Sequence, residues 1–74
     1  MKLPVLKPRT LIKVLNKLEF YEVRKTGSHV ILANKTSKQI ISVPVHENKD
    51  IKKGLLRSII RQTGLTVKEF IEML

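Results

Sequence analysis

Two histidines are the residues of this chain best suited to move a proton, because the ordinary pKa of histidine, about 6.5, lies close to neutral pH. His29 stands in the stretch KTGSHVILA, directly after Gly27 and Ser28 and at the start of a run of β-forming residues. Gly27 permits a turn with positive φ and lets a ligand approach the backbone, and the Ser28 hydroxyl is able to donate a hydrogen bond to a phosphate. The stretch makes His29 the candidate catalytic residue, although a histidine at the start of a strand is more often a packing or surface residue.

Other kinds of reactive site are disfavoured by residue type and spacing. The chain has no cysteine, and the grouping of His29 and His46 with Glu47 and Asp50 matches no recognised zinc or hydrolase motif. Ser28 and His29 are expected to point to opposite faces of a strand, which would prevent a hydrogen bond between their side chains and a nucleophile pair. We therefore expect neither a metal site nor a small-molecule cofactor.

The charge of the chain favours a polyanionic partner. Fifteen Lys and Arg residues against six Asp and Glu give a formal net charge of +9, and such an excess attracts nucleic acid through counterion release. Lys53 and Arg57 are four residues apart and share one face of a predicted helix, so they are candidates for phosphate contacts together with Lys25. If that helix begins near the Lys25 hairpin, its free N–H groups would help to hold a phosphate. The alternative is that these cations are only the solvated side of the helix.

The elements that must position these residues follow from hydrophobic periodicity. Apolar residues at three- and four-residue spacing predict a helix over 8–18, and β-rich runs predict strands over 20–25, 29–34 and 39–44. In the first strand, Tyr21, Val23 and Lys25 alternate with Phe20, Glu22 and Arg24. A second helix is predicted over 51–64, ended by Gly64, and a short helix follows the capping box at Thr66 and buries Val67, Phe70, Ile71 and Leu74.

This order indicates one α+β domain over residues 1–74, in which helices cover one face of a three-stranded antiparallel sheet and the other face stays open. The chain has no apolar run long enough to span a membrane and no signal-peptide core. With no cysteine it suits a reducing compartment, so we expect a cytoplasmic protein.

Two motifs in the right order resemble the HicA family of toxins over nearly the whole chain. LEFYEVRKTGSHVIL is similar to the helix and strand that lead into the family's Gly-Ser-His signature, and SVPVHENKDIKKGLLRSIIRQTGL is similar to its second signature. The resemblance implies a fold akin to the double-stranded RNA-binding domain, an mRNA interferase activity with His29 as the catalytic residue, and a HicB antitoxin that covers the site. Glu19 and Leu55 depart from the family, which commonly has glycine and a hydroxyl residue at these positions.

The chemistry of RNA explains how so small a chain could cut it without a metal. The 2′-hydroxyl is the nucleophile, so the protein needs only to move protons and hold the phosphate, the latter through Lys25, Gly27, Ser28, Lys53 and Arg57. His46 is a candidate for the second proton carrier, although we favour a structural hydrogen bond as the reason for its presence. Rival functions are a noncatalytic RNA-binding module and an interaction protein with an acidic partner. Because the chain has few aromatic residues for base stacking, we expect it to bind RNA mainly through phosphate and sugar, with weak sequence preference.

Overall fold

The structure, a computed structural model, describes residues 2–74. Its first helix, α1 (Pro8–Lys17), begins at a proline, whose missing N–H costs nothing in the first turn of a helix. Leu11, Val14 and Leu15 are buried on one side of α1, as their spacing predicts. The helix ends one residue before the predicted boundary at Leu18.

The predicted three-stranded antiparallel sheet is confirmed. It consists of β1 (Phe20–Lys25), β2 (His29–Asn34) and β3 (Ile40–Pro44), with the strand order β1-β2-β3. β3 begins one residue later than predicted. In the loop between β2 and β3, the Asn34 side chain accepts hydrogen bonds from the backbone N–H groups of Thr36 and Ser37, which closes the turn.

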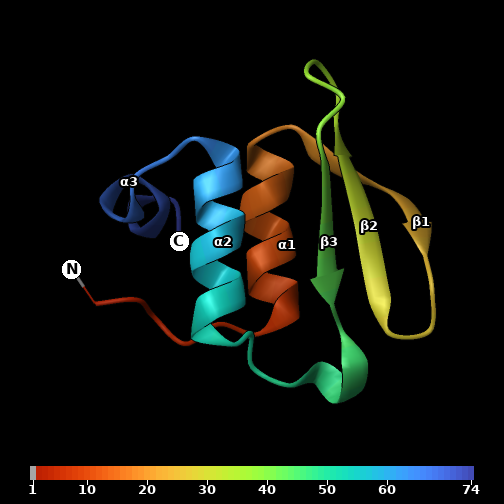
Figure 1. Cartoon of the computed structure of the whole chain (residues 1–74), viewed down its shortest axis with the longest axis horizontal. Coiled ribbons are helices and arrows are strands. Elements are labelled where there is room, and N and C mark those ends of the chain that lie inside the picture. Colours follow the sequence, from red (N-terminus) through yellow and green to blue (C-terminus); the bar gives the residue numbers. More distant parts are fainter. Residues whose placement is uncertain (1) are drawn as a thin grey trace.

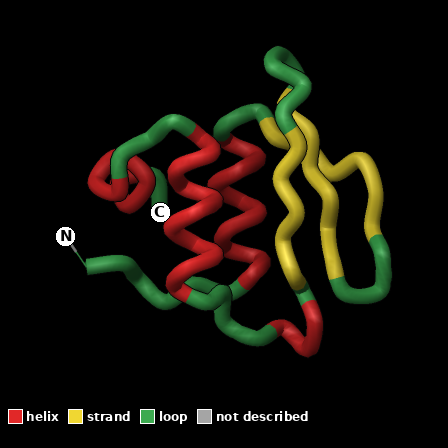
Figure 2. Tube along the Cα trace, in the orientation of Figure 1, coloured by secondary structure: helices red, strands yellow, loops and turns green. Residues whose placement is uncertain are grey.

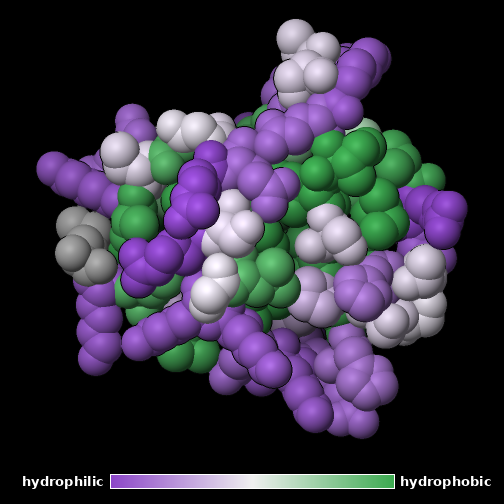
Figure 3. Space-filling model, viewed as in Figure 1, coloured by the Kyte–Doolittle hydropathy of each residue, from purple (hydrophilic) through white to green (hydrophobic). Residues whose placement is uncertain are grey.

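One face of the sheet packs against the helices and the other is open. Val30, Leu32, Ile41 and Val43 are buried on the helix side. Strand register places a second set of residues on the opposite face, which we call the outer face: Tyr21, Arg24, His29, Ile31, Ala33, Ile40, Ser42 and Pro44. Figure 3 shows hydrophobic side chains at the surface over the strands, while hydrophilic ones surround them.

A β-bulge changes the faces of β1 from those that simple alternation gives. Glu22 pairs with Leu32, but the next pair is Arg24 with Ile31, so Val23 is the extra residue. Paired residues share a face, and Lys25 pairs with the buried Val30. Arg24 therefore lies on the outer face and Lys25 on the helix side, the reverse of the alternation in the sequence.

The second half of the chain forms a short 3-10 helix, η1 (His46–Asn48), and then α2 (Lys53–Thr63). Leu56, Ile59 and Ile60 of α2 are buried, so the apolar stripe of this helix is part of the core. Gly64 ends α2 with a φ of 83°, a left-handed conformation that favours glycine, as predicted.

The final helix, α3 (Val67–Glu72), begins with the predicted capping box. The Thr66 hydroxyl accepts from the Glu69 backbone N–H, and the Glu69 carboxylate accepts from the Thr66 backbone N–H. Phe70 is fully buried, and Val67 packs against the core. The expectation that Leu74 is buried is wrong, because Leu74 is 50% exposed just beyond the helix.

Figure 1 shows how these elements meet: α1 lies beside α2, and both helices lie to one side of the sheet. The first turn of α2 also comes close to the end of β3, because Leu55 and Pro44 line the same pocket. Both helices begin at the end of the molecule that carries the β1–β2 turn and η1, as the tube in Figure 2 also shows. The α+β class is confirmed, and the order of the elements is consistent with a double-stranded RNA-binding-domain-like fold. No helix within residues 2–74 is both long and apolar enough to cross a membrane.

Candidate active site

His29 is exposed at the first position of β2, and hydrogen bonds on both sides hold its backbone. Its N–H donates to Thr26 Oγ1 at 3.0 Å, and the Thr26 N–H donates to the His29 carbonyl at 2.9 Å. At the preceding position, the Ser28 carbonyl accepts a hydrogen bond from the Val45 N–H at 2.8 Å. These bonds tie the β1–β2 turn to the segment after β3, so the histidine stands on a fixed backbone.

The ring of His29 is held by the preceding serine. Ser28 Oγ and His29 Nδ1 are 3.0 Å apart, which is a hydrogen bond. The expectation that these two side chains cannot meet is wrong, because Ser28 lies in the bend before the strand and strand alternation does not apply to it. Nδ1 is thus occupied, and Nε2 is the ring nitrogen left for a substrate.

Gly27 lies in the same bend but does not use the conformational freedom of glycine. Within residues 2–74, Gly64 is the glycine with positive φ, so the expected role of Gly27 in a positive-φ turn is wrong. A Cβ atom at Gly27 would meet no heavy atom within 4 Å. What the glycine does provide is an open stretch of backbone next to His29.

His46 lies at the start of η1, two residues after Pro44, the strand partner of His29. Its side chain is 66% exposed, and Nε2 lies 3.3 Å from the Glu47 carboxylate. Within the described chain, the Glu47 carboxylate is the polar partner of this side chain. His46 is thus exposed near the corner of His29, with its Nε2 beside a carboxylate.

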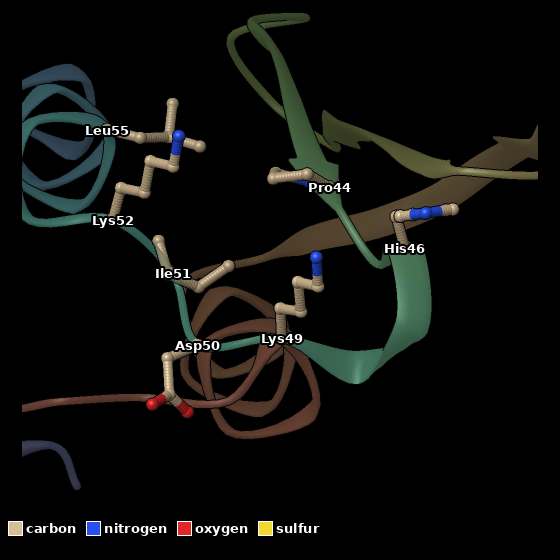
Figure 4. A pocket seen from close by; sticks show the side chains of 7 residues that line it. All are labelled: Pro44, His46, Lys49, Asp50, Ile51, Lys52 and Leu55. Carbon is tan, nitrogen blue, oxygen red and sulfur yellow. The ribbon is translucent and has the colours of Figure 1, made fainter.

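A pocket of about 310 Å³ lies between η1 and the start of α2. Figure 4 shows the Lys49 and Lys52 side chains extending from its rim, whereas the Asp50 carboxylate points away from it. Asp50 instead pairs with Lys7 at 2.9 Å, and Lys49 lies 3.5 Å from Glu47. Of the two lysines, Lys52 is therefore the one without an ion-pair partner in the described part of the chain.

The structure does not gather all the predicted phosphate contacts around His29. Lys53 and Arg57 are exposed on α2 and line neither pocket, although the neighbouring Lys52 shares one with Pro44, the strand partner of His29. Lys25 is closer in sequence to His29 but lies on the helix side of the sheet, since it pairs with Val30. On the outer face, the cation nearest to His29 by register is Arg24, which pairs with Ile31.

Sequence reasoning missed the cations that do lie beside Lys25. Arg9 and Lys13 of α1 line a second pocket with Lys25, so it is the start of α1, not of α2, that approaches the hairpin. Their spacing of four residues on one helix face was the available signal. Thr26 was also missed, although a threonine three residues before His29 suits a turn of this kind.

The outer face also holds a polar pair at the start of β1. Glu19 has a φ of 70°, and its carboxylate accepts a hydrogen bond from the Tyr21 hydroxyl. This hydrogen bond raises the pKa of Tyr21, because losing the hydroxyl proton would place two negative charges together. Glu19 is thus tied to the outer face through Tyr21.

Within residues 2–74, no three His, Asp or Glu side chains come together in a way that could hold a metal ion. The arrangement offers one exposed imidazole with an oriented ring, a second imidazole near it, and surrounding cations. Such groups suit proton transfer at a bound anion.

Comparison with known proteins identifies the family. The family described as HicA toxin of bacterial toxin-antitoxin matches residues 8–65. The match covers α1, the whole sheet, η1 and α2, and includes both histidines. No curated protein matches the sequence. The chain therefore belongs to the HicA family, the toxins of bacterial toxin-antitoxin systems.

Proposed function

We propose that this toxin is an endoribonuclease that cuts mRNA in the cytoplasm with His29 as its catalytic residue and without a metal ion. The observation that carries the proposal is the hydrogen bond between Ser28 Oγ and His29 Nδ1, which fixes an exposed imidazole with Nε2 free. Membership of the HicA family supports a toxin that acts on a cellular target.

The hydrogen bond suits proton transfer in either direction. When Nε2 acts as a base, the neutral ring carries its proton on Nδ1, and when Nε2 acts as an acid, both nitrogens are protonated. In both forms Nδ1–H donates to the Ser28 oxygen, so the ring keeps its orientation while a proton moves at Nε2. The hydroxyl hydrogen of Ser28 then remains available to a phosphate oxygen of the substrate.

The reaction requires two proton transfers. The 2′-oxygen of the RNA attacks the neighbouring phosphorus as its proton passes to a base, and the bond from phosphorus to the 5′-oxygen breaks as an acid protonates the leaving oxygen. The products are a cyclic 2′,3′-phosphate and a free 5′-hydroxyl. His29 supplies one transfer, and His46, exposed at the same corner, supplies the other.

Cations stabilise the charge that develops on the phosphate. Lys25, Lys53 and Arg57 act with the open backbone of Gly27 and the hydroxyl of Ser28 in this proposal. Because Lys53 and Arg57 lie on α2 and line neither pocket near His29, they hold phosphates farther along the RNA and not the one that is cut. Lys25 serves a nucleotide next to the cleaved bond.

The decisive experiment incubates purified protein with a defined RNA in excess EDTA and compares it with His29→Ala and His46→Ala. We expect undiminished cleavage by the unchanged chain, a loss of about 10²–10⁴-fold in His29→Ala, and products that end in a cyclic phosphate. His29→Gln serves as a further control, since glutamine keeps a polar side chain of similar size but cannot carry a proton. Binding without cleavage would instead identify a noncatalytic RNA-binding module.

We further propose that the antitoxin partner is a HicB-like protein that covers the outer face. Tyr21, Val23 and Ile40 are 46%, 62% and 54% exposed. Tyr21 and Ile40 both pair with Ala33, so this apolar area lies toward the end of β2 opposite to His29. A chain with a net charge of +9 favours an acidic partner over a second copy of itself. Ile40→Asp should weaken the binding of the protein encoded by a neighbouring HicB-like gene, as measured by calorimetry. If the unchanged chain and the variant bind that protein with equal affinity, the outer face is excluded as the antitoxin-binding surface.

A further inference from the structure

A second pocket, which we call the α1 pocket, opens on the helix side of the sheet, at the end that carries His29. It has a volume of about 370 Å³ and lies between the first turns of α1, the end of the β1–β2 hairpin and η1. Ile12, Val30 and Val45 give it an apolar wall. Its size lies at the lower end of the range for small-molecule sites, so it is suited to one nucleotide and not to a duplex.

The charged residues around the α1 pocket are unpaired. Arg9, Lys13 and Lys25 line it, and none of them forms an ion pair within residues 2–74. One carboxylate, that of Glu22, stands among them and likewise has no ion-pair partner there. A ligand that matches this lining carries a negative charge for the cations, an apolar body, and a hydrogen-bond donor for the carboxylate.

We propose that the α1 pocket binds a single nucleotide of the RNA next to the cleaved bond and prefers a base with an exocyclic amino group. The cations would hold its phosphate, and the base would rest on the apolar wall. An ionised carboxylate only accepts hydrogen bonds, so Glu22 would accept from an amino group such as N4 of cytosine, whereas the uracil carbonyl at that position would be repelled. This inference rests on the proposed function for its link to cleavage.

The position of the pocket relative to His29 supports this link. His29 and Val30 are consecutive on β2, and their side chains lie on opposite faces of the sheet, His29 on the outer face and Val30 in the wall of the pocket. The hydrogen bond from Val45, another wall residue, to Ser28 connects the two places. An RNA strand that passes around this end of the sheet would present one phosphodiester to His29 and the neighbouring nucleotide to the pocket.

The test titrates the full chain with cytidine 3′-monophosphate, uridine 3′-monophosphate and inorganic phosphate, and follows backbone amides by NMR. We expect shifts at Ile12, Val30 and Val45, and about tenfold tighter binding of the cytidine nucleotide than of the uridine nucleotide. Phosphate should bind more weakly than either. Equal affinities for the two nucleotides, or shifts confined to other parts of the chain, would overturn the proposal.

Variants separate the base contact from general charge. Glu22→Gln should bring the two affinities to a ratio of about one, because an amide both donates and accepts. Lys13→Ala should weaken both nucleotides alike, whereas Lys35→Ala, which removes the same charge from the loop at the other end of the sheet, should weaken neither. If the two lysine variants weaken nucleotide binding equally, the attraction is nonspecific and the α1 pocket is refuted as a binding site.

The outcome is distinct from that of the cleavage experiment, because mononucleotides contain no bond to be cut. Nucleotide binding without RNA cleavage would refute the proposed function but would support the α1 pocket as a nucleotide-binding site. Cleavage of RNA by a chain whose pocket binds no nucleotide would refute the pocket alone.

Discussion

Gly27→Ala separates a role in the fold from a role in the site more sharply than the other single changes near His29. A Cβ atom there meets nothing within 4 Å, and φ lies outside the left-handed region. Alanine therefore fits without strain and restricts the unfolded chain, which should raise the free energy of unfolding by about 0.4–1 kcal/mol. For a domain of this size the midpoint of thermal unfolding should rise by about 2–8 °C.

Cleavage should respond in the opposite direction. If a phosphate approaches the open backbone at Gly27, a methyl group displaces it by on the order of 1 Å, and the rate of RNA cleavage should fall by about tenfold to a hundredfold. Calorimetry and a cleavage assay on the same preparation measure the two effects. A variant that is more stable and fully active would remove Gly27 from the site.

Gly64→Ala is the matched control for this prediction. Gly64 has a φ of 83° at the end of α2, where alanine should cost about 1–2 kcal/mol of unfolding free energy. Its cleavage rate per folded molecule should stay at the level of the unchanged chain, because Gly64 lies at the end of α2 opposite to the helix start. If Gly27→Ala destabilises as much as Gly64→Ala, the description of the β1–β2 turn is refuted.

Three further predictions concern binding, the outer face and the core. Lys53→Ala and Arg57→Ala should each reduce the magnitude of the slope of log RNA affinity against log salt by about 0.7–1, relative to a lysine-to-alanine control in the β2–β3 loop. An unchanged slope would exclude Lys53 and Arg57 as phosphate contacts. Glu19→Gln should lower the raised pKa of Tyr21 toward about 10, measured by tyrosinate absorbance on the single tyrosine of the chain. Because the folded-state pKa is the higher one, the stability from this pair is present below the ordinary tyrosine pKa and is lost as pH rises through the raised value. Phe70→Ala should cost about 3–5 kcal/mol in urea unfolding, since Phe70 is fully buried, and a cost under about 1 kcal/mol would show that α3 is not part of the core.

Much of the fold could be predicted from local patterns in the sequence. The spacing of Leu11, Val14 and Leu15 predicts the buried side of α1, and Gly64 predicts the end of α2. The capping box at Thr66 likewise predicts the start of α3. These predictions hold because periodicity, capping and left-handed glycine are decided by residues close together in the chain.

The candidate site was only partly predictable. The sequence indicated His29 and its neighbours Gly27 and Ser28, because three reactive or small residues in a row stand out in a chain with two histidines. It gave the wrong geometry for Ser28, since a strand rule was applied to a residue of the bend. His46 was named without the strand pairing that brings it to the corner of His29.

The sequence by itself determined the elements of this protein, its positive charge and the histidine that we propose for catalysis. The tertiary structure decided which cations act together. The bulge at Val23 shifts the register, so Lys25 turns to the helix side, where it meets Arg9 and Lys13 of α1 while Lys53 stays apart. A bulge and the packing of a helix depend on pairing between distant segments, and no local pattern of residue types records that pairing.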